Sequence, residues 1–203
     1  MKKKILIIGA SKGIGKCTRE ILQTNFDVTY TSRKKHKNKK VLNFDLKKKY
    51  NFKALSSIFK KKNDIIILNG FTKIKRIPIK KINVKDVKKI FNENFFSYIN
   101  LVIFLIQKKL VKNFLLVNTR AIITGGYNIS HYTSLKLALE TFIKHSTKNL
   151  KNIKFYDIKF GPVDTNICSY KNRPKNKNSI TELQAAKKIQ YLIYKKIFPD
   201  DKY

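Results

Sequence analysis

The chain contains little cysteine, and this excludes two classes of protein. Cys17 and Cys168 are the only cysteines among 203 residues, so a disulfide framework is not available. Neither they nor the three scattered histidines have the spacing of a metal site. Because free thiols fit a reducing compartment, we expect a cytoplasmic protein.

Long hydrophobic runs are also missing. The longest apolar stretch, residues 95–106, is interrupted by Ser97 and Asn100 and is shorter than the roughly 20 residues that cross a bilayer. The lysine-rich start is followed by only six apolar residues and no cleavage pattern, which argues against a signal peptide. We therefore expect no membrane partner and interpret residues 4–9 as a buried strand.

Acidic residues are scarce. There are 12 Asp and Glu against 46 Lys and Arg, and the formal net charge is +34. Such an excess is common in chains that bind nucleic acid. However, only five of the basic residues are arginine, so the bidentate donors that read bases are rare. The lysines are spread from end to end, as expected from codon bias in an AT-rich genome, and we expect no specific nucleic acid partner.

Short apolar runs alternate with helical patterns along the chain. We expect strands at 4–9, 27–31, 41–44, 64–69, 114–117 and 153–160, and helices at 14–22, 84–110, 132–148 and 181–198. This alternation predicts an α/β fold with a doubly wound parallel sheet of about six strands (a Rossmann fold) in a single domain, residues 1–203.

Two connections in this predicted fold are unusual. Only about nine residues join the second and third strands, too few for a crossover helix, so one face of the sheet should be less covered there. Residues 166–180 are polar and of low complexity, and we expect them to form a mobile substrate loop.

A glycine-rich segment, GASKGIG, follows the first strand and opens a helix. Its glycines permit a tight turn and a close approach of the backbone to a pyrophosphate, while the helix N-terminus offers N–H groups and the positive end of its dipole. We therefore predict a dinucleotide-binding loop. Its residues are Gly9, Ser11, Lys12, Gly13, Ile14 and Gly15.

An acidic residue is missing where NAD enzymes usually bind the ribose 2′-hydroxyl. The second strand ends near Arg33, and no Asp or Glu lies between Asp27 and Asp45. Lys12 and Arg33 can instead pair with a 2′-phosphate, which carries roughly two charges. We predict NADP(H) as the cofactor in preference to NAD(H), and a solvated basic loop is the alternative interpretation.

Tyr132 and Lys136 are four residues apart at the start of a predicted helix, so their side chains share a face. An ammonium near a phenol stabilises the phenolate and lowers its pKa from about 10. Such a tyrosine can act as a general acid or base for a carbonyl–alcohol pair. The pair predicts a catalytic site, with a surface tyrosine as the alternative.

The order of these motifs resembles the short-chain dehydrogenase/reductase family, whose G-x-x-x-G-x-G fingerprint and Y-x-x-x-K pair match this chain. The resemblance extends from Met1 to about Thr165. It implies an NADP(H)-dependent oxidoreductase that interconverts a carbonyl and an alcohol on a small molecule, and a homodimer or homotetramer. A catalytically weakened NADP-binding sensor or scaffold of the same fold is the alternative.

The resemblance implies further cofactor contacts at three places. One follows the third strand, where the family contacts adenine. One is similar to the end of the family's N-N-A-G motif, although Phe71 replaces the usual glycine. The third, GPVDT, is similar to a P-G-x-V-x-T segment that contacts the nicotinamide amide. The residues implied are Asp45, Asn69, Gly70, Val163 and Thr165, and Tyr132 and Lys136 would contact the nicotinamide ribose.

Two further catalytic residues are implied by the same resemblance. Asn94 matches an asparagine at a helix kink whose carbonyl orients a water near the lysine, and Asn92 is the competing candidate. The family's serine, which hydrogen-bonds the substrate carbonyl, lies thirteen residues before the tyrosine, at Thr119 here. Threonine keeps the hydroxyl, whereas a small gap would place Arg120 or Ala121 at this position.

Overall fold

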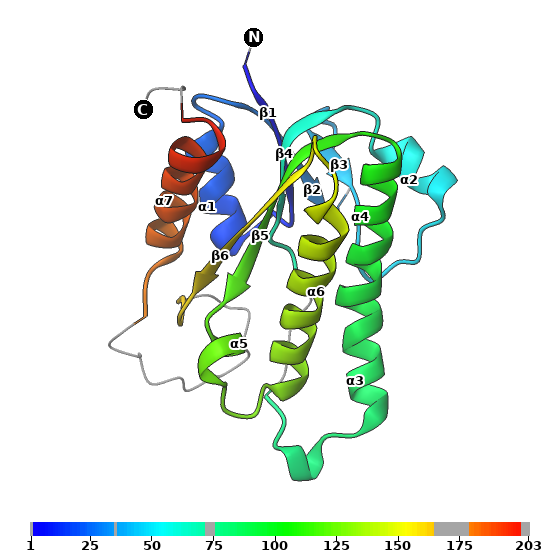
Figure 1. The fold of residues 1–203 in the computed structure, drawn as a ribbon, viewed down its shortest axis with the longest axis vertical. Helices are drawn as coiled ribbons and strands as arrows, with labels where there is room; N and C mark the ends of the chain where they lie inside the picture. Colours follow the sequence, from blue (N-terminus) through cyan, green and yellow to red (C-terminus); the bar gives the residue numbers. More distant parts are fainter. Residues whose placement is uncertain (1, 35, 72–75, 165–178, 200–203) are drawn as a thin grey trace.

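The computed structural model describes residues 2–34, 36–71, 76–164 and 179–199. Six parallel strands form one sheet in the order β3-β2-β1-β4-β5-β6 (Figure 1). They are β1 (Lys4–Ile8), β2 (Asp27–Ser32), β3 (Val41–Asn43), β4 (Asn63–Leu68), β5 (Val111–Thr119) and β6 (Lys154–Phe160). The order reverses between β1 and β4, and the carboxyl ends of these strands border the crevice where such sheets bind ligands. The predicted doubly wound Rossmann fold is confirmed.

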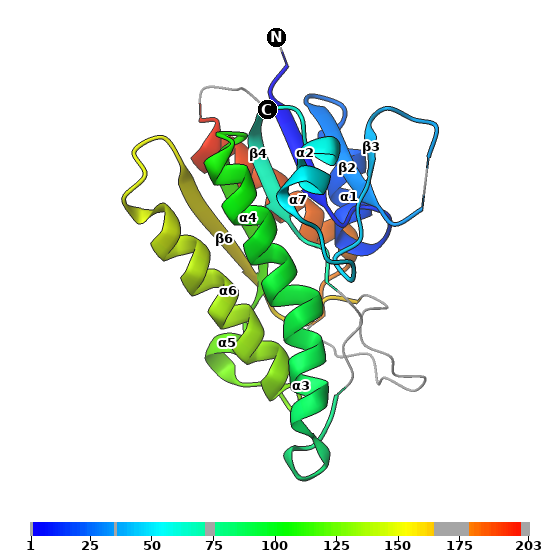
Figure 2. The same ribbon diagram turned by 90° about the vertical axis from the view of Figure 1, so that its right-hand side faces the viewer.

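Helices cover both faces of the sheet (Figures 1 and 2). Helices α1 (Gly13–Leu22) and α7 (Glu182–Leu192) pack together on one face. Helices α4 (Ser97–Gln107) and α6 (Ser130–Lys148) lie on the other face, where α6 contacts β5 and β6. The short helices are α2 (Phe52–Ile58), α3 (Val84–Ile90) and α5 (Ala121–Thr124).

The core is divided by the sheet into two clusters because successive strand residues point to opposite faces. In β1, Ile5 and Ile7 pack with the α1 and α7 side, whereas Leu6 and Ile8 pack with the α4 and α6 side. All four are at most 1% exposed. Burial on both faces explains why β1 is a continuous apolar run rather than an alternating one.

The region predicted as one helix, residues 84–110, contains three elements. The α3 helix is followed by a π-helical segment, Phe91–Phe96. This segment leads into α4, which ends at Gln107. A π-helical turn inserts an extra residue into the helical repeat and often occurs at functional sites. The two short helices α2 and α5 and a 3₁₀ turn at Ile79–Lys81 were not predicted.

The connection between β2 and β3 contains no helix in its described residues, as its length predicted. None of the helices in the described ranges is long and apolar enough to cross a membrane. The same residues include no group of three or more His, Cys, Asp or Glu side chains suited to holding a metal ion.

Candidate active site

The loop between β1 and α1 depends on glycine at two positions for steric reasons. Gly9 has a φ of +87°, and a Cβ there would lie 2.2 Å from the Cα of Gly70. A Cβ on Gly15 would lie 2.1 Å from the carbonyl oxygen of Gly9. Both distances are far below van der Waals contact, so any side chain would force the loop apart. The predicted fingerprint thus forms a compact turn at the carboxyl end of β1.

Hydrogen bonds of Asn69 hold this turn against the end of β4. Its Nδ2 donates to the carbonyl oxygen of Gly9 at 2.9 Å. The backbone N–H groups of Asn69 and Gly70 both donate to Ile8, at 3.1 and 2.6 Å. The hydroxyl of Thr31, on β2, accepts from the N–H of Gly9 at 2.9 Å. Sequence reasoning missed Thr31, because a threonine inside a strand carries no motif.

The second half of the loop, residues 11–13, leads into the start of α1 and is accessible to solvent. Gly13 has a φ of +65°, and α1 begins there with no acidic residue in its first turn. Ser11 and Lys12 are exposed beside it. One carboxylate is close, because Glu182 Oε1 lies 3.5 Å from the point where a Gly13 Cβ would be. The cradle therefore fits a phosphate group through backbone N–H groups and Lys12, with Glu182 as an opposing charge.

The predicted residues for the adenosine half lie at the ends of β2 and β3. Arg33 follows β2 directly and its side chain is exposed, while its carbonyl accepts from Asn43 Nδ2 at 3.0 Å. Asp45 follows β3, and its Oδ1 accepts from the N–H of Lys47 at 3.1 Å. Both positions lie at the same edge of the sheet as the glycine loop, since all strands are parallel.

Tyr132 and Lys136 lie in the first turns of α6, as predicted, with different surroundings. Tyr132 is half-buried, whereas Lys136 is only 2% exposed. Lys136 Nζ donates to the carbonyl oxygen of Val117, on β5, at 2.6 Å. It lies 5.9 Å from the centre of the Tyr132 ring. Burial holds the pKa of Lys136 well below its ordinary value, because an ammonium loses its hydration there.

Phe71 lies against this pair. The centre of its ring is 3.5 Å from Lys136 Nζ, and the ring meets Tyr132 edge to face at 6.4 Å. It also packs against Tyr98 at 5.3 Å. Tyr98 is fully buried and its hydroxyl donates to the carbonyl oxygen of Gly70 at 2.5 Å. The segment 69–71 therefore connects the glycine loop at one end with the Tyr-Lys pair at the other.

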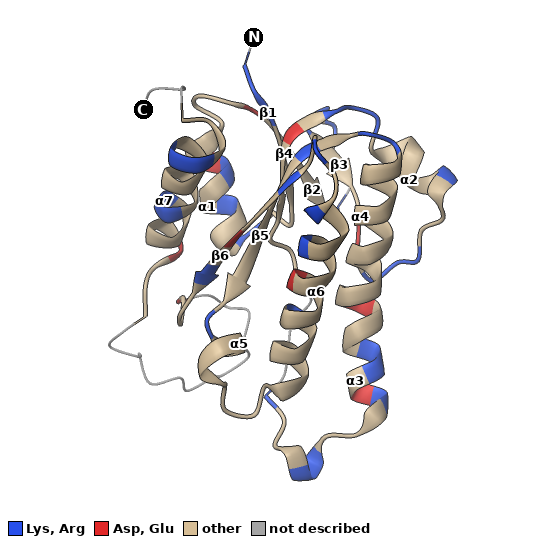
Figure 3. Cartoon of the chain, viewed as in Figure 1, with Lys and Arg blue, Asp and Glu red and all other residues tan. Residues whose placement is uncertain are grey.

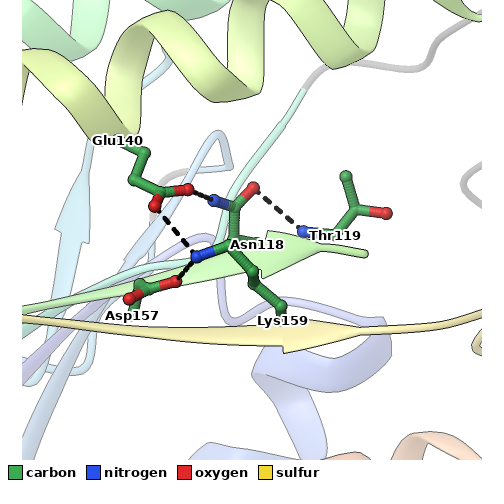
Figure 4. A network of polar contacts seen from close by, with 5 residues as sticks. All are labelled: Asn118, Thr119, Glu140, Asp157 and Lys159. Carbon is green, nitrogen blue, oxygen red and sulfur yellow. Dashed lines mark hydrogen bonds and ion pairs between the residues drawn. The ribbon is translucent and has the colours of Figure 1, made fainter. Parts of the chain in front are cut away.

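Thr119 is the last residue of β5 and lies beside a polar network (Figure 4). Its N–H donates to Asn118 Oδ1 at 2.9 Å, and Asn118 Nδ2 donates to Glu140 Oε2 at 2.6 Å. Lys159 binds both Glu140, at 2.9 Å, and Asp157. Figure 4 shows the Thr119 side chain pointing away from the carboxylates, and Thr119 Oγ1 accepts from a following backbone N–H at 3.3 Å.

The alternatives to Thr119 belong to the next turn. Arg120 precedes α5 and donates its N–H to Phe160 at 2.7 Å, and Ala121 is the first residue of that helix. Of these three residues, only Thr119 has a hydroxyl group, and it lies at the end of β5.

Asn94 is fully buried in the π-helical segment, and its Nδ2 donates to the carbonyl oxygen of Ile90 at 3.0 Å. The competing Asn92 is exposed, and its carbonyl accepts from Ser97 Oγ at 3.0 Å. The structure thus places the Asn94 side chain inside the π-helical segment and the Asn92 side chain on its exposed side.

The segment after β6 is described only in part. Val163 forms a parallel bridge with Ile180, and the N–H of Asp164 donates to Ile180 at 2.9 Å. Thr165, Cys168 and most of the predicted substrate loop lie outside the described residues.

Comparisons with known proteins agree with this architecture. The family model for short chain dehydrogenase matches residues 3–176. A short chain dehydrogenase from Burkholderia cenocepacia, solved in complex with NADP, is 16% identical with a TM-score of 0.76, covering 92% of this chain and 81% of its own. The structure described as ElxO with NADP bound is 20% identical with a TM-score of 0.74, covering 95% and 91%.

A short chain dehydrogenase family protein from Francisella tularensis subsp. tularensis is 21% identical, with a TM-score of 0.75 and coverage of 95% and 91%. No curated protein matches the chain significantly. At these identities the solved structures show the fold, while the family model spans most of the sequence. The chain therefore belongs to the short chain dehydrogenase family of oxidoreductases.

Proposed function

We propose that the protein is an NADP(H)-dependent oxidoreductase that interconverts a carbonyl and an alcohol on a small molecule. The observation that carries the proposal is the position of the Tyr132–Lys136 pair, which the segment 69–71 connects to the glycine loop. A cofactor held at the glycine loop would run along the crevice toward this pair. The exposed Lys12 and Arg33 support NADP(H) in preference to NAD(H), because a 2′-phosphate needs a cationic partner.

Bound NADPH would supply the hydride for the carbonyl carbon. Tyr132 donates its phenolic proton to the carbonyl oxygen and takes it back in the reverse direction. Lys136, when charged, favours the phenolate and holds the nicotinamide ribose. Thr119 donates a hydrogen bond that orients the carbonyl, and the backbone carbonyl of Asn94 holds a water for proton supply. The remaining cofactor contacts are assigned to Ser11, Gly13, Ile14, Asp45, Val163 and Thr165.

Tyr132→Phe tests this assignment. The variant keeps the ring but loses the transferred proton, so we expect carbonyl reduction across a substrate panel to fall by about 10²- to 10⁴-fold. NADPH consumption followed by absorbance measures the rate, and a titration of NADPH fluorescence should show a much smaller change in the dissociation constant, because the glycine loop and Lys136 are retained. A variant that turns over near the wild-type rate would rule out Tyr132 as the acid.

A second function is favoured by one observation, the contact between Phe71 and Lys136. If this ring permanently keeps the ammonium from the cofactor, the protein is an NADP-binding sensor or scaffold with weak chemistry. Tight NADPH binding without reduction of any carbonyl in the panel would support that role. Measurable turnover that depends on Tyr132 would exclude it.

A further inference from the structure

Phe71 stands between the two halves of the proposed site. It directly follows Asn69 and Gly70, which are bonded to the end of β1 and the glycine loop. Its ring contacts both members of the Tyr132–Lys136 pair. A residue in this place can affect cofactor binding and proton transfer together.

The ring covers one side of the Lys136 ammonium. A hydroxyl bonded to Nζ needs about 2.8 Å between nitrogen and oxygen, and about 3 Å more to clear an aromatic face. The observed distance from Nζ to the ring centre is 3.5 Å, so no oxygen fits between them. A second direction is taken by the carbonyl oxygen of Val117, at 2.6 Å. A ribose hydroxyl therefore cannot reach Lys136 Nζ from the side that the Phe71 ring occupies.

The ring is supported on one side and open on another. Tyr98 lies behind it at 5.3 Å and is itself fixed by its bond to Gly70. Phe71 is nonetheless only half-buried, in contrast to the fully buried Tyr98. The Phe71 side chain is thus partly accessible to solvent, while its other side packs against the core.

We propose that Phe71 is a positioning residue that controls access of the nicotinamide ribose to Lys136. Its ring covers the ammonium when no cofactor is bound and turns aside when the ribose hydroxyls bind Lys136. The inference rests on the proposed function, since it requires Lys136 to hold the ribose. Because cofactor binding must first break the contact between ring and ammonium, the observed affinity is lower than the intrinsic one.

Removing the ring should also change the protonation of Lys136. The groups that face it are the Tyr132 phenol on the same helix, the Val117 carbonyl on β5 and the Phe71 ring. Glu140, four residues further along α6, binds Asn118 and Lys159 instead. Water admitted by a smaller residue would rehydrate the ammonium and bring the pKa of Lys136 back toward its ordinary value.

The test compares Phe71→Ala and Phe71→Leu with the wild-type protein. We expect Phe71→Ala to bind NADPH about tenfold more tightly in a fluorescence titration, and Phe71→Leu to lie between the two. Trace acetylation of the intact protein at several pH values is read for the Lys136 peptide by mass spectrometry. In Phe71→Ala the labelling profile should shift to higher pH, because only the neutral amine reacts, and its plateau at high pH should rise, because the amine is more exposed. A ring with a merely structural role would weaken NADPH binding when removed.

Phe52→Ala is the matched control. The Phe52 ring also packs edge to face, against Phe104 at 5.6 Å, but Phe52 belongs to α2 and not to the segment that contacts Lys136. It should leave both readouts unchanged. Equal NADPH affinity in the wild type and in Phe71→Ala would overturn the access role while leaving the proposed function intact. Absence of NADPH binding in both would overturn both proposals. If circular dichroism shows Phe71→Ala to be unfolded, Phe71→Leu decides in the same way.

Discussion

At the scale of single residues, the glycines and the basic residues of the cofactor crevice act by different physics. Gly9 and Gly15 matter through space, because a Cβ at either position would collide with backbone atoms. Lys12 and Arg33 are exposed, and in the proposed function they would act through charge. Loss of a glycine should therefore disturb the loop for any dinucleotide, whereas loss of a charge should act on one cofactor only.

Arg33→Ala measures the charge effect. An arginine that pairs with a 2′-phosphate contributes a charge-assisted hydrogen bond, so we expect the dissociation constant of NADPH to rise about tenfold while that of NADH stays constant. Isothermal titration with both cofactors gives the ratio. Lys39→Ala is the control, since Lys39 is an equally exposed charge further along the same loop. An equal loss for NADPH and NADH would refute the phosphate role of Arg33.

At the scale of elements, hydrogen bonds from two successive turns of α6 attach this helix to β5. Lys136 donates to the Val117 carbonyl, and four residues later Glu140 accepts from the Asn118 side chain. Lys159 on β6 binds the same carboxylate. Burial alone would lower the pKa of Lys159, but its bonds to the two carboxylates outweigh this and raise it. The attachment keeps the helix that carries the Tyr-Lys pair in register with the strand that ends at Thr119.

Glu140→Ala should loosen this attachment. Asn118 is 4% exposed and would lose the acceptor for its amide, so we expect the free energy of unfolding to fall by about 1–3 kcal/mol. Urea unfolding followed by circular dichroism provides the value. Glu20→Ala on α1 is the control, because this carboxylate forms ion pairs on an exposed surface and should cost under about 1 kcal/mol. Similar losses in the two variants would show that the network adds nothing beyond a surface ion pair.

Sequence patterns predicted the long elements and the motif positions, but not the contacts among them. The buried strand β4 and the helix α6 carry clear apolar patterns, whereas α2 and α5, of seven and four residues, are too short to show a helical period. Phe71 was identified as a departure from a motif. Its contact with Lys136 was not predictable, because the two residues come together only when β4 and α6 are placed on the sheet. The Asn118–Glu140–Lys159 network has the same origin.

At the scale of the whole molecule, basic side chains are distributed rather than gathered. Lys and Arg occur on both helical layers and at both ends of the sheet (Figure 3). A hollow of about 260 Å³ at the amino end of the strands is lined by lysines around Asp64. Burial alone would raise the pKa of Asp64, but hydrogen bonds from Lys112 and from the Lys4 N–H outweigh this and lower it. This carboxylate is thus already paired, and the surrounding lysines add to the overall positive field.

A field of this kind predicts nucleic acid binding without a dedicated site. Binding of a labelled random-sequence DNA duplex, measured by anisotropy, should fall steeply between low and moderate salt, because it is driven by release of counterions.

Two triple variants test whether the basic charge is spread over the whole surface. One changes Lys2, Lys3 and Lys62 to Gln near the amino end of the sheet, and the other changes Lys85, Lys88 and Lys89 to Gln on α3. Since all six lysines are exposed, we expect each set to reduce the slope of log affinity against log salt equally, by at most about 3. A loss confined to one set would instead mark that face as a binding surface. Equal losses would attribute the binding to the positive charge of the whole chain rather than to one dedicated surface.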